Sequence, residues 1–281
     1  MNRINIRALL LPALGIIAAL SLGVVVSQEI KLVKSKDGKS VGYTDTPKLP
    51  WTSGPFFKHD PDRPLPPEIT PGTPSTADRP GTAPSDAIVL FDGKNTEKWK
   101  PNQWKLESGV LTAAGGDLET LDSFGDCQLH LEWSAPNPPQ GSQMDRGNSG
   151  VFMMSRYEIQ ISDSFTEKIY ADGSAASVYG ETPPMVNATR PPGQWQVYDI
   201  IFKAPVFKDG KLAIPARLTM FHNGLLVHLD TEIHGPVAWR TIAEYQPHPD
   251  KQPLKLQYHG NPVRFRNIWI RPLDLAAEEK R

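Results

Sequence analysis

A carboxylate and an amide stand two residues apart in the segment NSGVFMMSRYEIQISD, where Glu158 and Gln160 alternate with apolar residues. An apolar residue at every second position is typical of a β-strand that has one face in the core. On the other face, a carboxylate and an amide fixed by the strand can bind sugar hydroxyls, because each hydroxyl both donates and accepts hydrogen bonds. The segment therefore predicts a sugar-binding surface.

Three other segments, CQLHLEW, PLKLQYHG and VRFRNIW, also alternate polar with apolar residues. Their polar positions include His130, Glu132, Lys255, Gln257, His259, Arg264 and Arg266. If the strands are neighbours in one sheet, these side chains form one patch, which a bent jelly-roll sheet would turn into a groove. Glu132 and Lys255 can instead be solvated strand residues, and the arginines can simply pair with carboxylates. After Arg266 the alternation changes phase, which predicts a bulge near Asn267.

The polar patch contains the groups that proton abstraction requires. A general base is a carboxylate or imidazole within hydrogen-bond reach of the proton, and a developing oxyanion requires a nearby cation or donor. Glu158 with His259 and Lys255 would supply both. A pair of carboxylates could instead carry out ordinary glycoside hydrolysis.

Motifs of several other enzyme classes are missing from the sequence. It contains no HExxH zinc motif, no GxSxG nucleophile elbow, no P-loop and no dinucleotide fingerprint. The His and Asp residues do not show metal-ligand spacing, so we predict no metal and no other cofactor; a divalent ion such as calcium in a loop stays open but unsupported. With a formal net charge of −1 and no basic block, the chain is not expected to bind nucleic acid.

Short strands must position these residues. From Asp86 onward, apolar runs of strand length alternate with turns, and Asn223-Gly224 between two such runs predicts a hairpin. Helix-like periodicity is nearly absent before the charged tail. The pattern predicts an all-β fold, a jelly-roll sandwich of two antiparallel sheets. Its core must be sufficient for stability, because the single cysteine, Cys127, cannot form an intrachain disulfide.

The chain divides into four predicted parts. They are a signal peptide or N-terminal anchor (1–28), a Pro-rich extended tether (29–85), the β domain (86–273) and a charged tail (274–281). Arg3 and Arg7 followed by a long apolar run are typical of export, and the length of that run leaves an uncleaved anchor open. We expect an exported protein, periplasmic, extracellular or anchored by this segment, which would be its one contact with a membrane.

An ordered set of motifs resembles the 3-keto-disaccharide hydrolase family over residues 86–273. The motifs are FDGKNTEKW, LEW, GNSGVF, RYEIQISDS, PPGQWQVYDIIFKAP, NGLLVH and HGNPVRFRNIWIRPL. The resemblance implies a concanavalin A-like β-sandwich that cleaves glycosides whose glucose ring is oxidised at carbon 3. In such a sugar the ketone acidifies the hydrogen on C2; a base removes it, the enolate expels the C1 substituent, and water addition completes a net hydrolysis.

The resemblance also implies which residues take part. It adds Asn148 and Ser149 from the NSG motif and Asp163 from the YEIQxxDS motif to the sugar-binding residues. It favours Glu158 or His259 as the catalytic base.

In this reaction, either Arg266 or Lys255 would be the cation that stabilises the enolate. Two other readings of the same fold remain: a non-catalytic carbohydrate-binding module and a conventional glycosidase with two carboxylates. In each case the expected partner is a carbohydrate.

Overall fold

The computed structural model describes residues 32–52 and 54–275. The chain divides into two compact units, with the boundary between Pro64 and Leu65. The predicted signal or anchor segment and nearly all of the charged tail lie outside the described residues. Within those residues, no helix is both long enough and apolar enough to span a membrane.

The first unit contains little regular structure. β1 (Val33–Lys34) pairs antiparallel with β2 (Val41–Gly42), and the rest of the described part consists of turns, bends and extended chain. The segment predicted as a tether, residues 29–85, thus spans the boundary between the two units.

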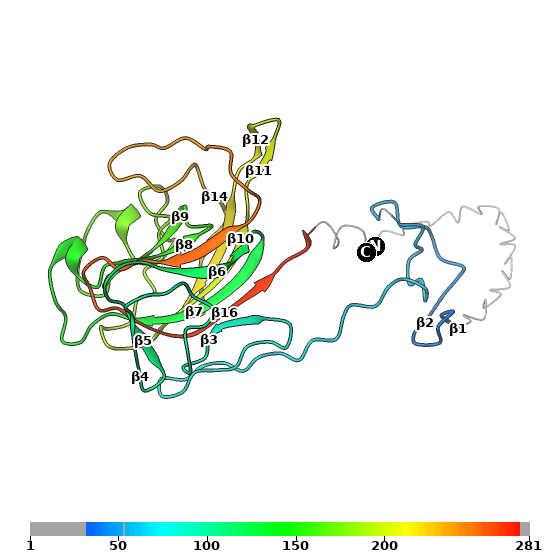
Figure 1. Cartoon of the computed structure of the whole chain (residues 1–281). Helices are drawn as coiled ribbons and strands as arrows, with labels where there is room; N and C mark the ends of the chain where they lie inside the picture. Colours follow the sequence, from blue (N-terminus) through cyan, green and yellow to red (C-terminus); the bar gives the residue numbers. More distant parts are fainter. Residues whose placement is uncertain (1–31, 53, 276–281) are drawn as a thin grey trace, which may run out of the picture. The chain divides into compact units, whose positions relative to one another are not determined.

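The second unit is an all-β sandwich, as the sequence predicts (Figure 1). Its larger sheet consists of β3 (Ile88–Phe91), β4 (Lys105–Glu107), β5 (Val110–Thr112), β7 (Cys127–Ser134), β10 (Gln196–Lys203), β13 (Arg217–His222), β14 (Leu225–Glu232) and β16 (Arg264–Pro272). Its smaller sheet consists of β6 (Leu118–Phe124), β8 (Ser149–Met153), β9 (Tyr157–Ile161) and β15 (Gln252–Leu256). β11 (Val206–Lys208) and β12 (Lys211–Ile214) form a separate hairpin. Two 3₁₀ turns, η1 (Gln143–Asp145) and η2 (Ala171–Gly173), interrupt the loops.

All pairings within the two main sheets are antiparallel. The larger sheet has the order β14-β13-β10-β7-β16-β5-β4, with β3 also paired to β16, and the smaller has the order β6-β15-β8-β9. Strands far apart in the sequence are therefore neighbours, and β15 joins β6 to β8 across more than a hundred residues.

The core lies between the two sheets. Leu129, Leu131 and Trp133 of β7 are fully buried in the same cluster as Ile159 of β9 and Leu256 of β15. Burying each aliphatic side chain contributes about 1.5–3 kcal/mol to folding. The alternation predicted from the sequence is confirmed in these strands. Because both inner faces meet in one core, the outer faces of the two sheets point in opposite directions.

Two predicted irregularities are confirmed. Asn223 (φ 52°) and Gly224 (φ 81°) form the turn between β13 and β14, where left-handed conformations suit an Asn-Gly hairpin. The pairing of β16 with β7 shifts between Arg266 and Trp269, and Asn267 within that shift has a φ of 48°. The bulge turns Arg266, Asn267 and Trp269 toward the same outer face.

The last part of the predicted tether packs on the sandwich. The Ser75 hydroxyl donates to the Glu132 carboxylate, and Arg266 Nη2 donates to the Thr76 carbonyl oxygen at 2.7 Å. The compact unit accordingly begins at Leu65 rather than at Asp86, where strand-like runs begin in the sequence. Single side-chain hydrogen bonds of this kind leave no periodic pattern from which they could be predicted.

Candidate active site

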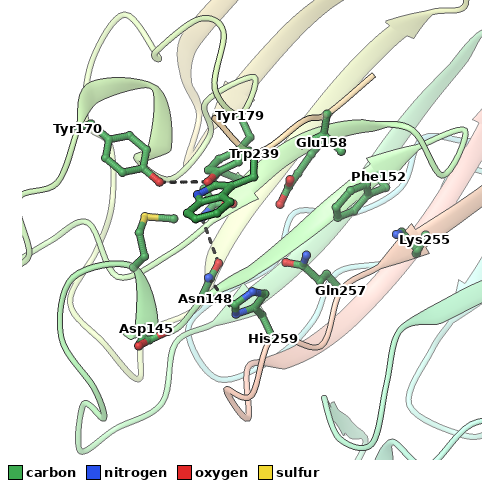
Figure 2. Close-up of a pocket in the computed structure, with 13 residues that line it drawn as sticks. Asp145, Asn148, Phe152, Glu158, Tyr170, Tyr179, Trp239, Lys255, Gln257 and His259 are labelled. Carbon is green, nitrogen blue, oxygen red and sulfur yellow. Dashed lines mark hydrogen bonds between the residues drawn. The ribbon is translucent and has the colours of Figure 1, made fainter. Parts of the chain in front are cut away.

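A cavity of about 510 Å³ opens on the outer face of the smaller sheet (Figure 2). It is lined by Met144, Asp145, Asn148, Phe152, Glu158, Gln160, Tyr170, Tyr179, Val237, Trp239, Lys255, Gln257 and His259. The volume lies within the range typical of small-molecule sites, roughly 300–1,000 Å³. Six residues predicted from the sequence therefore meet in one place: Asn148, Glu158, Gln160, Lys255, Gln257 and His259.

Strand register arranges the floor of the cavity in two rows. Lys255 of β15 pairs with Phe152 of β8, which pairs with Glu158 of β9. In the next row Gly150 pairs with Gln160, and the Gln257 N–H donates to the Gly150 carbonyl oxygen at 2.9 Å. Cross-strand neighbours on one face lie within contact distance.

Gly150 leaves an opening in the middle of this floor. A Cβ atom built on Gly150 would overlap Glu158 Oε1 and crowd the Phe152 ring. The Glu158 carboxylate thus occupies space that only a glycine provides.

Glu158 is a buried carboxylate at the edge of this opening. Glu158 is only 6% exposed. Burial raises the pKa of its carboxyl group to about 8, and the positive charge of Lys255 opposes this rise. Within the described residues, no cation lies within ion-pair distance of it. Lys255 instead pairs with Asp117 at 3.2 Å and lies 4.0 Å from the centre of the Phe152 ring.

Two amide side chains, Asn148 and Gln160, connect the exposed His259 with Glu158. Asn148 Nδ2 lies 3.2 Å from His259 Nδ1, and Gln160 Nε2 lies 3.2 Å from Asn148 Oδ1 (Figure 2). Turning the Gln160 amide places its nitrogen 3.1 Å from Glu158 Oε1 and its oxygen 3.2 Å from Asn148, whose amide must turn as well in order to donate to it. The amides can therefore transmit the orientation of the imidazole to the carboxylate.

Two other predicted residues have structural contacts. Ser149 Oγ donates to the Gln257 carbonyl oxygen at 2.7 Å. Asp163 accepts from Arg146 Nε at 2.6 Å and from the Phe165 N–H at 3.2 Å. Neither lines the cavity; they fix the loops beside it.

The remaining predicted residues lie on the outer face of the larger sheet. They are His130, Glu132, Arg264 and Arg266, from β7 and β16. The prediction that all these side chains form one patch required their strands to be neighbours in one sheet. It is wrong, because β7 and β16 belong to one sheet and β9 and β15 to the other. Arg266 therefore cannot stabilise an enolate beside Glu158.

Glu132 is the centre of this second cluster. It is completely buried, and it accepts from Arg266 Nε at 2.7 Å, from Asn267 Nδ2 at 2.8 Å and from the Ser75 hydroxyl. Burial alone would raise the pKa of Glu132, but its hydrogen bonds, including that with His130, outweigh burial and hold the pKa below its usual value.

His130 and Arg264 complete the second cluster. Burial alone would lower the pKa of His130, but the carboxylates of Asp199, at 2.6 Å, and Glu132 raise it to about 9. Arg264 Nη2 donates to Ser134 Oγ at 3.0 Å and to the Gly193 carbonyl oxygen at 3.2 Å. Every charged group here already has protein partners.

The aromatic wall of the cavity could not be predicted from the sequence. Tyr170, Tyr179 and Trp239 come from long loops without periodicity, and the two tyrosine hydroxyls lie 3.0 Å apart (Figure 2). An isolated tryptophan in a polar loop, as at Trp239, is the one signal that could have indicated it. In the described part of the chain, no group of three or more His, Cys, Asp or Glu side chains is arranged to hold a metal ion.

Comparisons with known proteins agree with the motifs. A family model described as the 3-keto-alpha-glucoside-1,2-lyase-like domain matches residues 86–271, which confirms the resemblance. The crystal structure of a protein from Parabacteroides distasonis ATCC 8503, described as a candidate glycosyl hydrolase, is 38% identical, with a TM-score of 0.73 over 79% of this chain and 99% of its own. Another, similarly described protein from that organism is 22% identical, with a TM-score of 0.50 over 66% and 99%, and shows the fold alone. The curated proteins give no match.

Proposed function

The chain belongs to the family of 3-keto-alpha-glucoside-1,2-lyase-like domains, and we propose that it is an exported enzyme that cleaves 3-keto-glycosides. One observation carries the proposal: Glu158, a buried carboxylate that has no cationic partner among the described residues, lies on the floor of a cavity lined by amides and an imidazole. A base with a raised pKa facing hydroxyl-binding groups suits proton abstraction from a sugar carbon.

The reaction begins at the carbon beside the ketone. The Glu158 carboxylate takes the proton from C2, and the electrons of the C–H bond form an enolate with the C3 oxygen. The enolate then expels the C1 substituent, which leaves as an alcohol after taking up a proton. Water adds to the resulting double bond, its proton returning to C2 and its hydroxyl to C1, so that the net change is hydrolysis.

Glu158 suits the role of base better than His259. A carboxyl group with a pKa of about 8 is a much stronger base than an ordinary carboxylate, yet it is partly ionised near neutral pH. His259 is exposed at the mouth of the cavity, where it can bind a sugar hydroxyl together with Asn148.

Lys255 is the cation that the cavity offers to the enolate oxygen. Glu158, Phe152 and Lys255 lie in this order in one cross-strand row, so the Glu158 carboxylate and the Lys255 ammonium group lie on opposite sides of the Phe152 ring. A fixed positive charge next to a developing oxyanion lowers the barrier by electrostatic stabilisation. The amides of Gln160 and Gln257 remain to bind the sugar hydroxyls.

The test compares a 3-keto-glucoside with the matching unoxidised glucoside. Proton NMR of each mixture with the full chain follows release of the aglycone. We expect release from the keto form alone. Cleavage of the unoxidised glucoside would indicate a conventional glycosidase, and chemical-shift changes without any cleavage would indicate a binding module.

A further inference from the structure

A second cavity, of about 700 Å³, adjoins the active-site cavity. Four residues line both cavities, namely Met144, Tyr170, Tyr179 and Trp239. Beyond them the second cavity is bordered by the segment from residue 238 to 242 and by Asp172 and Gly180. A molecule whose one end lies over Glu158 can therefore extend into this space.

The loops that form the second cavity are attached to the strands of the active site. The Tyr179 N–H donates to the Glu158 carbonyl oxygen at 3.1 Å, next to an isolated bridge between Ile159 and Val178. The Val237 N–H donates to the Arg156 carbonyl oxygen at 2.9 Å, just before β9. Backbone bonds to β9 and its turn thus fix both loops relative to the candidate base.

The surface of the second cavity is apolar and accessible. Trp239 is 72% exposed, Ile242 95% and Tyr170 48%, and the Arg240 guanidinium lies 5.4 Å from the centre of the Trp239 ring. Large apolar side chains gathered beside a cavity commonly mark a binding surface. An aromatic ring together with a stacked guanidinium offers a flat face for a planar group.

The two cavities differ in the chemistry that they offer to a ligand. The first presents a carboxylate, amides, an imidazole and an ammonium group, which suit the hydroxyls of one sugar ring. The second offers two tyrosine hydroxyls, the Trp239 indole N–H and the side chains of Asp172, Arg240 and Thr241, which are spread around an apolar wall. The hydroxyls of a second sugar that face Trp239 and Ile242 would find no partner on that wall, whereas an aromatic group needs none.

We propose that the second cavity is the aglycone subsite and that it selects glycosides with a planar aromatic aglycone. The proposal rests on the proposed function, because it assumes that the sugar ring lies over Glu158. Trp239 stacks on the aglycone ring, and Tyr170, Met144 and Ile242 enclose its edges. The substrate class is then aryl 3-keto-glycosides.

The test measures KM for phenyl, methyl and disaccharide 3-keto-glucosides of one anomer. In Trp239→Ala the KM ratio of phenyl to methyl is expected to rise about tenfold, because aromatic stacking is lost. Trp239→Phe keeps a ring and should retain most of the preference. Trp51→Ala is the matched control, since Trp51 is 77% exposed but lines neither cavity, and should leave the ratio unchanged.

Two results would overturn the aromatic assignment: an unchanged ratio in Trp239→Ala, or a loss for the disaccharide as large as for the phenyl compound. Saturation-transfer NMR with unoxidised phenyl glucoside separates this inference from the proposed function, because it needs no turnover. Contact of the phenyl protons with wild type but not with Trp239→Ala supports the subsite, even if no 3-keto-glucoside is cleaved. The absence of that contact in wild type refutes it.

Discussion

Glu132 and Glu158 are both buried carboxylates on the outer face of a sheet, one on each side of the sandwich. Glu132 accepts hydrogen bonds from an arginine, an asparagine and a serine, and its pKa is lowered. Glu158 has no cationic partner within the described residues, and its pKa is raised to about 8. Similar burial therefore gives opposite acidities, because the number of donors around each carboxylate differs.

The difference separates a structural carboxylate from a reactive one. The bonds to Glu132 come from β16 and from the segment around Ser75, so they hold the start of the second unit on the larger sheet. The surroundings of Glu158 leave its charged form poorly stabilised, which is costly for folding but useful for a base.

Exchanging each glutamate for glutamine tests whether the two carboxylates have different roles. Glu158→Gln should lower turnover of a 3-keto-glucoside about 1,000-fold, because general-base catalysis typically contributes between a hundredfold and ten-thousandfold. Its melting temperature should not fall, since no cation loses a partner. Turnover and thermal unfolding measured on one preparation check both statements, and retained turnover would remove Glu158 from the mechanism.

Glu132→Gln should have the reverse effect. It leaves Arg266 buried, at 6% exposed, without its carboxylate, and breaking a buried pair in this way costs about 3 kcal/mol of unfolding free energy. Urea unfolding checks the loss, and turnover per folded molecule should match wild type. A variant as stable as wild type but inactive would contradict the structural role.

The pH dependence of turnover is the next largest effect. With the pKa of Glu158 at about 8, the ionised fraction rises about 50-fold between pH 6 and pH 8, so kcat/KM should rise over this window. Stability should change in the opposite direction. Between pH 4.5, the ordinary pKa of a glutamate, and about 8, the folded state binds more protons than the unfolded state, so Glu158 makes stability fall as pH rises. A pH–rate profile that is flat above pH 5 would contradict the raised pKa.

Gly150→Ala should have the smallest effect, because it shifts the Glu158 carboxylate without removing it. The added methyl group must displace the Glu158 carboxylate, the flexible end of a side chain, so the fold should tolerate it. We expect turnover to fall about tenfold, since small misplacements of a catalytic group are expensive, with little change in melting temperature. Gly210→Ala is a control at a glycine that lines neither cavity, although its φ of 72° adds backbone strain that should appear in stability rather than in turnover.

Much of the fold could be predicted from the sequence because it depends on local patterns. The alternation around Glu158, the Asn223-Gly224 hairpin and the bulge at Asn267 each follow from a few neighbouring residues, and the structure confirms them. The motifs also identified the family, which the match to residues 86–271 confirms.

Sheet membership could not be predicted in this way. Alternation shows which side chains share a face of one strand, but packing of distant strands decides that Lys255 joins Glu158 while Arg266 does not. Trp239 and Tyr179 reach the cavity from irregular loops, whose paths depend on single backbone hydrogen bonds such as that from Tyr179 to Glu158. Such bonds have no periodic signature.

The hydrogen on C2 of the sugar reports directly on whether Glu158 is the base. A 3-keto-glucoside is incubated in deuterium oxide with wild type, Glu158→Gln or Glu132→Gln, and NMR records deuterium at C2 of the released sugar. We predict incorporation with wild type and with folded Glu132→Gln, and none above background with Glu158→Gln. Incorporation by Glu158→Gln at the wild-type rate would show that another group takes the proton, and would contradict this account.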